Sequence, residues 1–170
     1  VGVDPRRRRR GRGRRRRAAA ALAVAEAKIG QEEGIGEWTQ ITQEMINEFA
    51  DLTIDHQFIH VDEEAAKSVG FPTTVAHGFL SLSMLTHLAS SIKPDPELVK
   101  GIAMGLNYGF DKVRFLAPVP NGSNVRVRST LKSAELKGNA INFTRTYTME
   151  IEGSEKPALA ADWIVRLVYG

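Results

Sequence analysis

The clearest pattern along the chain is an apolar segment without any charged residue, from Ala76 to Ile92. Apolar residues occur on every face of a helix built from this stretch, and its polar residues are only Ser, Thr and His. A helix that is apolar all round is buried, and 17 residues are too few to span a membrane. The pattern therefore predicts a central helix that the rest of the fold wraps, ending before Lys93-Pro94.

After Pro96 the pattern changes to an alternation with a period of two, which is typical of β-strands. Turn signals separate the strands at Pro120-Asn121-Gly122 and at Lys137-Gly138-Asn139. The candidate strands are Ile102–Tyr108, Lys112–Leu116, Asn124–Glu135, Asn139–Glu152 and Ala158–Tyr169. Strands this long curl, and a curled sheet needs a core to wrap. We therefore predict an α+β fold, a curved antiparallel β-sheet wrapped around one long central helix.

Upstream of the central helix, two shorter helices carry start signals. Thr42 is a candidate N-cap, and Ile41 and Ile46 stand at the positions of a hydrophobic staple. Asp62 is a candidate N-cap for the second helix, which has two glutamates in its first turn. Residues 53–60 between the two helices have mixed character and are expected to form a loop.

Composition narrows the class of protein. The chain has 170 residues, 42% of them hydrophobic and 25% charged, which fits one globular domain. Cysteine is absent, and this excludes a disulfide scaffold, a Cys-ligated zinc site and a thiol nucleophile.

The net charge of +3 conceals a strongly basic N-terminal segment. Residues 1–17 hold ten arginines and one acidic residue, so residues 18–170 carry 13 basic and 19 acidic residues and a formal charge of −6. We divide the chain into an Arg-rich tail over 1–17, expected to be disordered, and a single domain over 18–170. The tail either binds nucleic acid or an anionic membrane, or is an extension without a function. We favour an extension without a function, because residues 18–170 lack a basic recognition helix. We therefore expect no nucleic acid and no membrane partner.

The segment from Ala18 to Ala25 has two interpretations. Arginines followed by alanines and a small-residue site mimic a signal peptide, but the apolar run of eight residues is short. Ala, Leu, Glu and Lys are good helix formers, so we favour an Ala-rich helix that ends near Gly30. This interpretation implies a cytoplasmic protein.

Candidate chemistry is concentrated just before and at the start of the central helix. Asp55 and His60 are five residues apart, and in a loop both side chains can reach one water molecule. Gly78 follows at the helix N-terminus, where unpaired N–H groups and the absent side chain suit an oxyanion hole. The alternative is structural, with a turn residue, a loop histidine and a packing glycine. The spacing of the four histidines does not suit a metal site, and we expect none.

The strings that contain these residues resemble a known family. The run IDHQFIHVDEEAA, followed by FPTTVAHGFLSLSML, is similar to the signature of the MaoC-like dehydratases, the (R)-specific enoyl-CoA hydratases of hot-dog fold. The run LNYGFDKVRFLAPVPNGSNVRV resembles the nodulation protein N-like branch of that family. The resemblance extends from about residue 20 to about residue 168.

The resemblance implies a function and roles for residues. It implies an enzyme that adds water across a trans-2-enoyl thioester to give an (R)-3-hydroxyacyl-CoA, with Asp55 and His60 as acid–base pair and Gly78 in the oxyanion hole. Gln57 stands where the family often has Asn, and it is an auxiliary candidate because an amide can orient a water. The implied partners are an enoyl-CoA or a related acyl thioester and a second copy in a homodimer. No cofactor is expected, since coenzyme A belongs to the substrate.

Two other functions compete with the hydratase. A hot-dog acyl-CoA thioesterase often carries an acidic residue on the central helix, and residues 76–92 have none. A non-catalytic acyl-thioester binding module has no need of an acid–base pair, yet both Asp55 and His60 are present.

Overall fold

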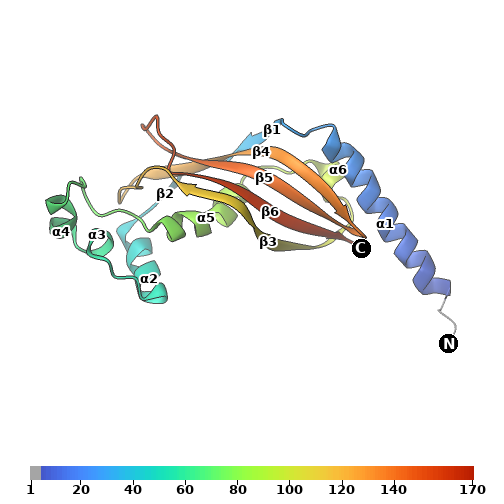
Figure 1. Cartoon of the computed structure of the whole chain (residues 1–170), viewed down its shortest axis with the longest axis horizontal. Helices are drawn as coiled ribbons and strands as arrows, with labels where there is room; N and C mark the ends of the chain where they lie inside the picture. Colours follow the sequence, from blue (N-terminus) through green and yellow to red (C-terminus); the bar gives the residue numbers. More distant parts are fainter. Residues whose placement is uncertain (1–4) are drawn as a thin grey trace.

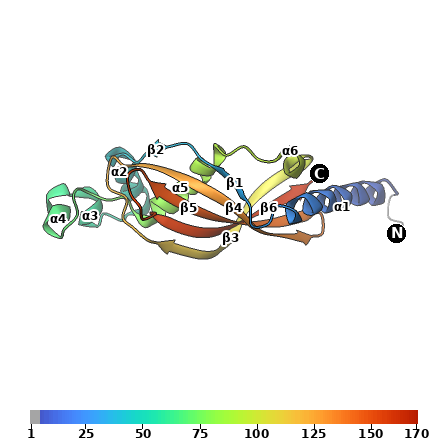
Figure 2. The same cartoon turned by 90° about the horizontal axis from the view of Figure 1, so that it is seen from above.

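The computed structural model describes the backbone of residues 5–170 and the side chains of residues 11–170. Its centre is a six-stranded antiparallel sheet in the order β1-β4-β5-β6-β3, with β2 also paired to β4 (Figures 1 and 2). The strands are β1 (Glu32–Ile35), β2 (Thr39–Gln40), β3 (Ile102–Phe115), β4 (Asn124–Lys137), β5 (Ala140–Ile151) and β6 (Leu159–Tyr169). The predicted curved antiparallel sheet is confirmed.

Two details of the sheet differ from the prediction. The strand β3 is continuous where two strands were expected, and register shifts at Tyr108 and Asp111 accommodate the interrupted alternation. The strands β1 and β2 were not predicted, because runs of four and two residues are too short to show a period.

The central helix α5 (Gly78–Ser90) packs on the sheet with one face only. That face carries Leu80, Ser81, Leu85 and Leu88, and the core that it joins includes Val125 and Val127 of β4. The opposite face is open, and Phe79 is 67% exposed. The expectation of a helix buried on all faces is therefore wrong for the single chain, since the sheet covers one side of it.

Three short helices lie together at one end of the molecule: α2 (Gln43–Thr53), α3 (Phe58–Val61) and α4 (Glu63–Ser68) (Figure 1). Both predicted N-caps are confirmed. The Thr42 hydroxyl accepts a hydrogen bond from the Met45 N–H at 3.3 Å, and the Asp62 carboxylate accepts one from the Ala65 N–H at 3.0 Å. The loop expected over 53–60 is partly wrong, because His60 lies in α3, a single turn too short to show a helical period.

The opposite end of the molecule holds α1 (Pro5–Glu26) and α6 (Pro96–Val99) (Figures 1 and 2). The predicted Ala-rich helix is present, and Ala18, Ala21 and Ala25 are buried against the sheet end and α6. The expected disorder over 1–17 differs from the structure, which has helix from Pro5 onward. Arginine is a good helix former, and docked alanines supply a nucleus from which helix propagates cheaply. Residues 1–4 lie outside the described part.

Helix α1 changes in burial and not in secondary structure near residue 18. Side chains 11–17 are exposed, and burial begins at Ala18. Among the described residues, no helix is both long and apolar enough to cross a membrane.

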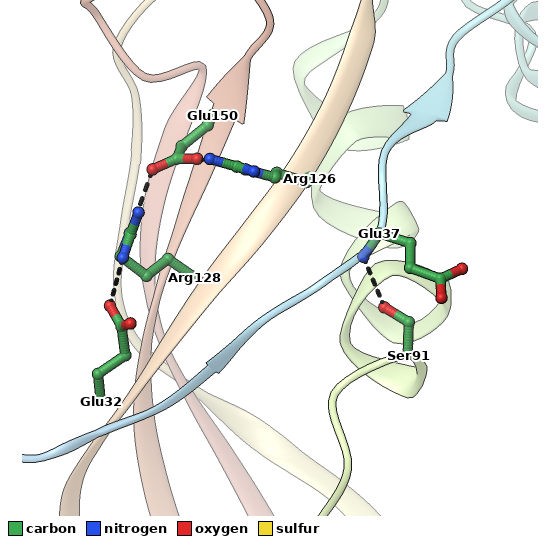
Figure 3. A network of polar contacts seen from close by, with 6 residues as sticks. All are labelled: Glu32, Glu37, Ser91, Arg126, Arg128 and Glu150. Atoms are coloured by element: carbon green, nitrogen blue, oxygen red, sulfur yellow. Dashed lines mark hydrogen bonds and ion pairs between the residues drawn. The ribbon is translucent and has the colours of Figure 1, made fainter.

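A polar network joins β1, β4 and β5 (Figure 3). It consists of Glu32, Arg126, Arg128 and Glu150. Glu150 receives hydrogen bonds from both arginines, at 2.6 and 3.1 Å, and Arg128 also donates to Glu32 at 2.6 Å. Nearby, the Glu37 N–H donates to the Ser91 hydroxyl at 2.9 Å, which ties the segment after β1 to the end of α5. The bond between Glu37 and Ser91 holds the C-terminal end of α5 to this segment.

Candidate active site

The structure brings Asp55, His60 and Gly78 to one end of α5. Asp55 follows the C-cap of α2, His60 lies in α3, and Gly78 is the first residue of α5. His60 and Gly78 both line a cavity of about 240 Å³ that Phe71 and Phe115 help to close. A carboxylate oxygen of Asp55 and one ring nitrogen each of His60 and His77 lie within 4.8 Å of one another.

His60 is held with one ring nitrogen free. The side chain is 7% exposed, and its Nδ1–H donates to the Val75 carbonyl at 2.6 Å. Because a carbonyl can only accept, this bond leaves Nε2 of the neutral ring with a lone pair. Burial lowers the pKa of His60 below its ordinary value, which keeps the ring in this basic form.

Asp55 has an exposed side chain on a fixed backbone. Its N–H donates to the Ala50 carbonyl at 3.1 Å, and its own carbonyl accepts a hydrogen bond from His77 Nε2–H at 2.9 Å. The preceding residue, Ile54, adopts φ +60°, a left-handed conformation that disfavours a β-branched residue by about 1–2 kcal/mol. The backbone of Asp55 is therefore anchored at its N–H and its carbonyl, and it follows a strained residue.

His77 also belongs to this site, although the sequence analysis gave it no role. It is 2% exposed and is the N-cap residue of α5. Its ring stacks on the ring of His60, with centroids 3.8 Å apart and 27° between the planes. Its Nδ1 is buried and has no hydrogen-bond partner among the described residues. Its place directly before Gly78 was the available signal.

Gly78 has a packing neighbour as well as a place at the helix start. A Cβ at this position would lie 3.1 Å from three ring atoms of Phe115, which is closer than an ordinary contact. As the first residue of α5, Gly78 carries an N–H outside the helical ladder. The structural and the oxyanion interpretations of this glycine both have support.

Gln57 contributes through its backbone. It is the N-cap residue of α3, but its side chain makes no capping bond. Its carbonyl accepts the His60 N–H at 2.9 Å, which fixes the start of the turn. The auxiliary role of its amide stays a prediction.

Asp55, His60 and His77 are also a group that could hold a metal ion. The two imidazoles lie nearly face to face, so their in-plane lone pairs run side by side instead of converging. Each ring also donates one nitrogen's proton to a backbone carbonyl. This is a poor geometry for the convergent N and O donors of a tetrahedral metal site.

A second, larger cavity of about 560 Å³ lies at the other end of α5. Arg145 and Glu33 form an ion pair in its wall, with Nε–Oε2 at 2.6 Å and Nη2–Oε1 at 3.1 Å. The Ser129 hydroxyl donates to the same carboxylate at 3.0 Å, and burial raises the pKa of Tyr147 beside it. Arg145 and Glu33 are thus already paired with each other in this wall.

Comparison with known proteins identifies close relatives. The family model described as "MaoC like domain" matches residues 24–152. 3-Hydroxyacyl-thioester dehydratase Z of Mycobacterium tuberculosis is 48% identical over 143 residues, which are 84% of this chain and 92% of that protein. Nodulation protein N of Rhizobium leguminosarum is 48% identical over 141 residues, which are 81% and 85% of the two chains.

Solved structures share the fold. A MaoC-like dehydratase from Rhodospirillum rubrum superposes with a TM-score of 0.68 at 18% identity, covering 84% of this chain and 93% of the other. An (R)-hydratase from A. caviae superposes with a TM-score of 0.62 at 20% identity, covering 81% and 94%. At these identities the likeness shows the fold alone, and the expected hot-dog fold is confirmed.

Proposed function

The chain belongs to the MaoC-like family and is a hydro-lyase of the dehydratase and hydratase type, and from this premise we propose that it is an (R)-specific enoyl-CoA hydratase. Such an enzyme adds water across a trans-2-enoyl thioester to give an (R)-3-hydroxyacyl-CoA. The observation that supports this most is a buried imidazole and a helix N-terminus in the wall of one cavity, with an oxygen of the Asp55 carboxylate within 4.8 Å of the imidazole.

The helix N-terminus suits the thioester carbonyl. We place the carbonyl oxygen against the Gly78 N–H, at the positive end of the α5 dipole. Hydrogen bonding there draws electrons toward the oxygen, which makes C3 electrophilic and stabilises the enolate that forms on attack. The cavity of about 240 Å³ holds the reacting end of the substrate and leaves the coenzyme outside.

Asp55 and His60 suit the water. One of them takes a proton from water as the oxygen bonds to C3, that proton passes to the other member of the pair, and the other member delivers it to C2. One atom of each group lies within 4.8 Å of the other, a gap that one water bridges, so the proton passes between them through that water. Both groups return to their starting states, and the net change is the addition of one water. The same groups catalyse dehydration in reverse, which is the activity in the printed name of the mycobacterial relative.

We also propose that the working unit is a homodimer. Strand β3 is the edge of the sheet, and one side of its 14 residues is unpaired. Exposed apolar side chains gather along it: Met104, Leu106, Tyr108, Phe110 and Phe115. A second copy related by a twofold axis would cover this edge. Light scattering on purified protein should give twice the chain mass, and a monomer at micromolar concentration would contradict the dimer.

The activity is tested by mixing the full chain with crotonyl-CoA and following the loss of enoyl absorbance, with longer enoyl chains in parallel. Chiral analysis of the product should give the (R)-3-hydroxyacyl-CoA. Release of free coenzyme A would instead support the thioesterase. Binding of the thioester without turnover would support the non-catalytic module.

A further inference from the structure

His77 contacts both members of the acid–base pair and is itself almost wholly buried. We propose that His77 is a positioning residue, which fixes the Asp55 backbone through its Nε2–H and the His60 ring through its face. This inference rests on the proposed function, because it assigns His77 a role in the same site. His77 does not touch the reacting atoms, and it acts through its two neighbours.

The hydrogen bond to Asp55 opposes a local strain. Ile54 is in the left-handed region, and a backbone in that conformation persists only where its surroundings hold it. The Asp55 N–H is bonded to Ala50 in α2, and the Asp55 carbonyl is bonded to His77 at the start of α5. Loss of the second bond would free the segment to relax and carry the exposed carboxylate away from His60.

The stacked ring supports His60 from one side. The His77 ring lies between the ring of His60, 3.8 Å away, and that of Phe49, 5.1 Å away. It therefore contributes to the burial that is the largest cause of the lowered His60 pKa. Among the described residues, Asp55 and His77 are the titratable groups that act on His60, the first raising its pKa and the second lowering it.

The unpartnered Nδ1 argues against a role in packing alone. A buried acceptor without a partner costs stability, and a phenyl ring of similar shape would fill the same space without it. If His77 only filled space, an apolar ring would serve the fold at least as well. The imidazole is needed for a ring that also donates to Asp55.

Two substitutions separate the two contacts. His77→Phe keeps a ring against His60 and removes the donor to Asp55. His77→Gln keeps a donor at the reach of Nε2 and removes the ring. His87→Gln is a matched control, since His87 is exposed on the last turn of the same helix. For each variant we would measure melting temperature, crotonyl-CoA hydration against pH, and the His60 pKa by NMR of labelled histidine.

We expect His77→Phe to keep its melting temperature and to lose roughly 10- to 100-fold in kcat with little change in KM, because a small misplacement of the pair is costly. We expect His77→Gln to restore kcat to within a few-fold of wild type at alkaline pH. In this variant the His60 pKa should rise toward its ordinary value, and the acid limb of kcat/KM should move up with it. His87→Gln should match wild type in every readout.

The proposal is overturned if His77→Phe turns over as fast as wild type per folded molecule. It is also overturned if both variants lose stability while the His60 pKa and turnover per folded molecule stay constant, which is the behaviour of a space-filling residue. A wild-type protein that does not hydrate crotonyl-CoA would instead contradict the proposed function. The His60 titration would still test the positioning role in that case.

Discussion

The two ends of α5 each border a cavity, and they differ in how well their polar groups are satisfied. The C-terminal cavity is more than twice as large, about 560 Å³ against about 240 Å³, and Arg145 and Glu33 in its wall pair with each other. The N-terminal cavity adjoins a buried nitrogen without a partner and a segment with a left-handed isoleucine. It also adjoins a glycine under a phenyl ring.

The difference separates a structural region from a reactive one. Folded proteins satisfy their buried polar groups and avoid strained backbone, and exceptions gather at functional sites. By that criterion we take the smaller cavity as the candidate site of chemistry, and the larger one, whose wall holds the Arg145–Glu33 pair, as structural. Cavity volume alone would select the other end.

The largest effects are expected from the acid–base pair. Asp55→Asn and His60→Gln should each lower turnover by about 100-fold or more, the range for a lost general acid or base. Asp55 is exposed, so Asp55→Asn should change the melting temperature little, whereas His60 is buried and bonded to Val75, so turnover of His60→Gln is compared per folded molecule. Steady-state kinetics on crotonyl-CoA with a melting curve for each variant gives the answer, and near-wild-type turnover would remove that residue from the mechanism.

A comparable loss is expected at Gly78. Gly78→Val should lower turnover by roughly 10²–10³-fold, because a branched side chain would keep the thioester from the N–H. Gly78→Ala would press on Phe115 and lose some stability as well. The double variant Gly78→Ala, Phe115→Ala relieves that contact. If the double variant is more stable than Gly78→Ala but no more active, the result supports the oxyanion role. If both stability and turnover recover, Gly78 is a packing residue.

At the other end, Arg145→Met should change stability and spare turnover. It would leave Glu33 mostly buried without its partner, since the two side chains are 16% and 19% exposed. We expect a loss of about 2 kcal/mol, below the ~3–5 kcal/mol of a fully buried pair. Chemical denaturation measures it, and Lys67→Met at an exposed ion pair of α4 is the control. A large fall in turnover per folded molecule would show that this end takes part in catalysis.

A smaller, opposite effect is expected at Ile54. Ile54→Gly relieves the left-handed strain, and the side chain is 83% exposed, so little packing is lost. Glycine's own entropy cost offsets part of the gain, which leaves a stabilisation of about 0.5 kcal/mol. The same denaturation curve measures it. A destabilised variant would mean that Ile54 makes a contact in the working assembly.

The smallest effect is expected from deletion of residues 1–17. The alanines that dock α1 begin at Ala18, and the exposed arginines before them contribute no core. Turnover and melting temperature should stay within error of the full chain. A marked loss of either would show that the arginines bind an anionic partner or a part of the site.

The sequence predicted features whose causes are local. Thr42 and Asp62 are caps because their hydroxyl and carboxylate reach an N–H three residues on. The approach of Asp55 to His60 followed from their spacing and from the resemblance. The stack of His77 on His60 depends on how α3 docks against the start of α5, and no local pattern encodes it. The open face of α5 was not predicted. An apolar face indicates that something covers it, but the pattern does not say whether the covering residues belong to the same chain.

The most direct test measures hydration of crotonyl-CoA per folded molecule in three proteins side by side: wild type, His60→Gln and Arg145→Met. The account predicts that wild type and Arg145→Met form the (R)-3-hydroxy product at equal rates, and that His60→Gln is slower by about 100-fold or more. Equal losses in both variants, or no hydration by the wild type, would contradict it.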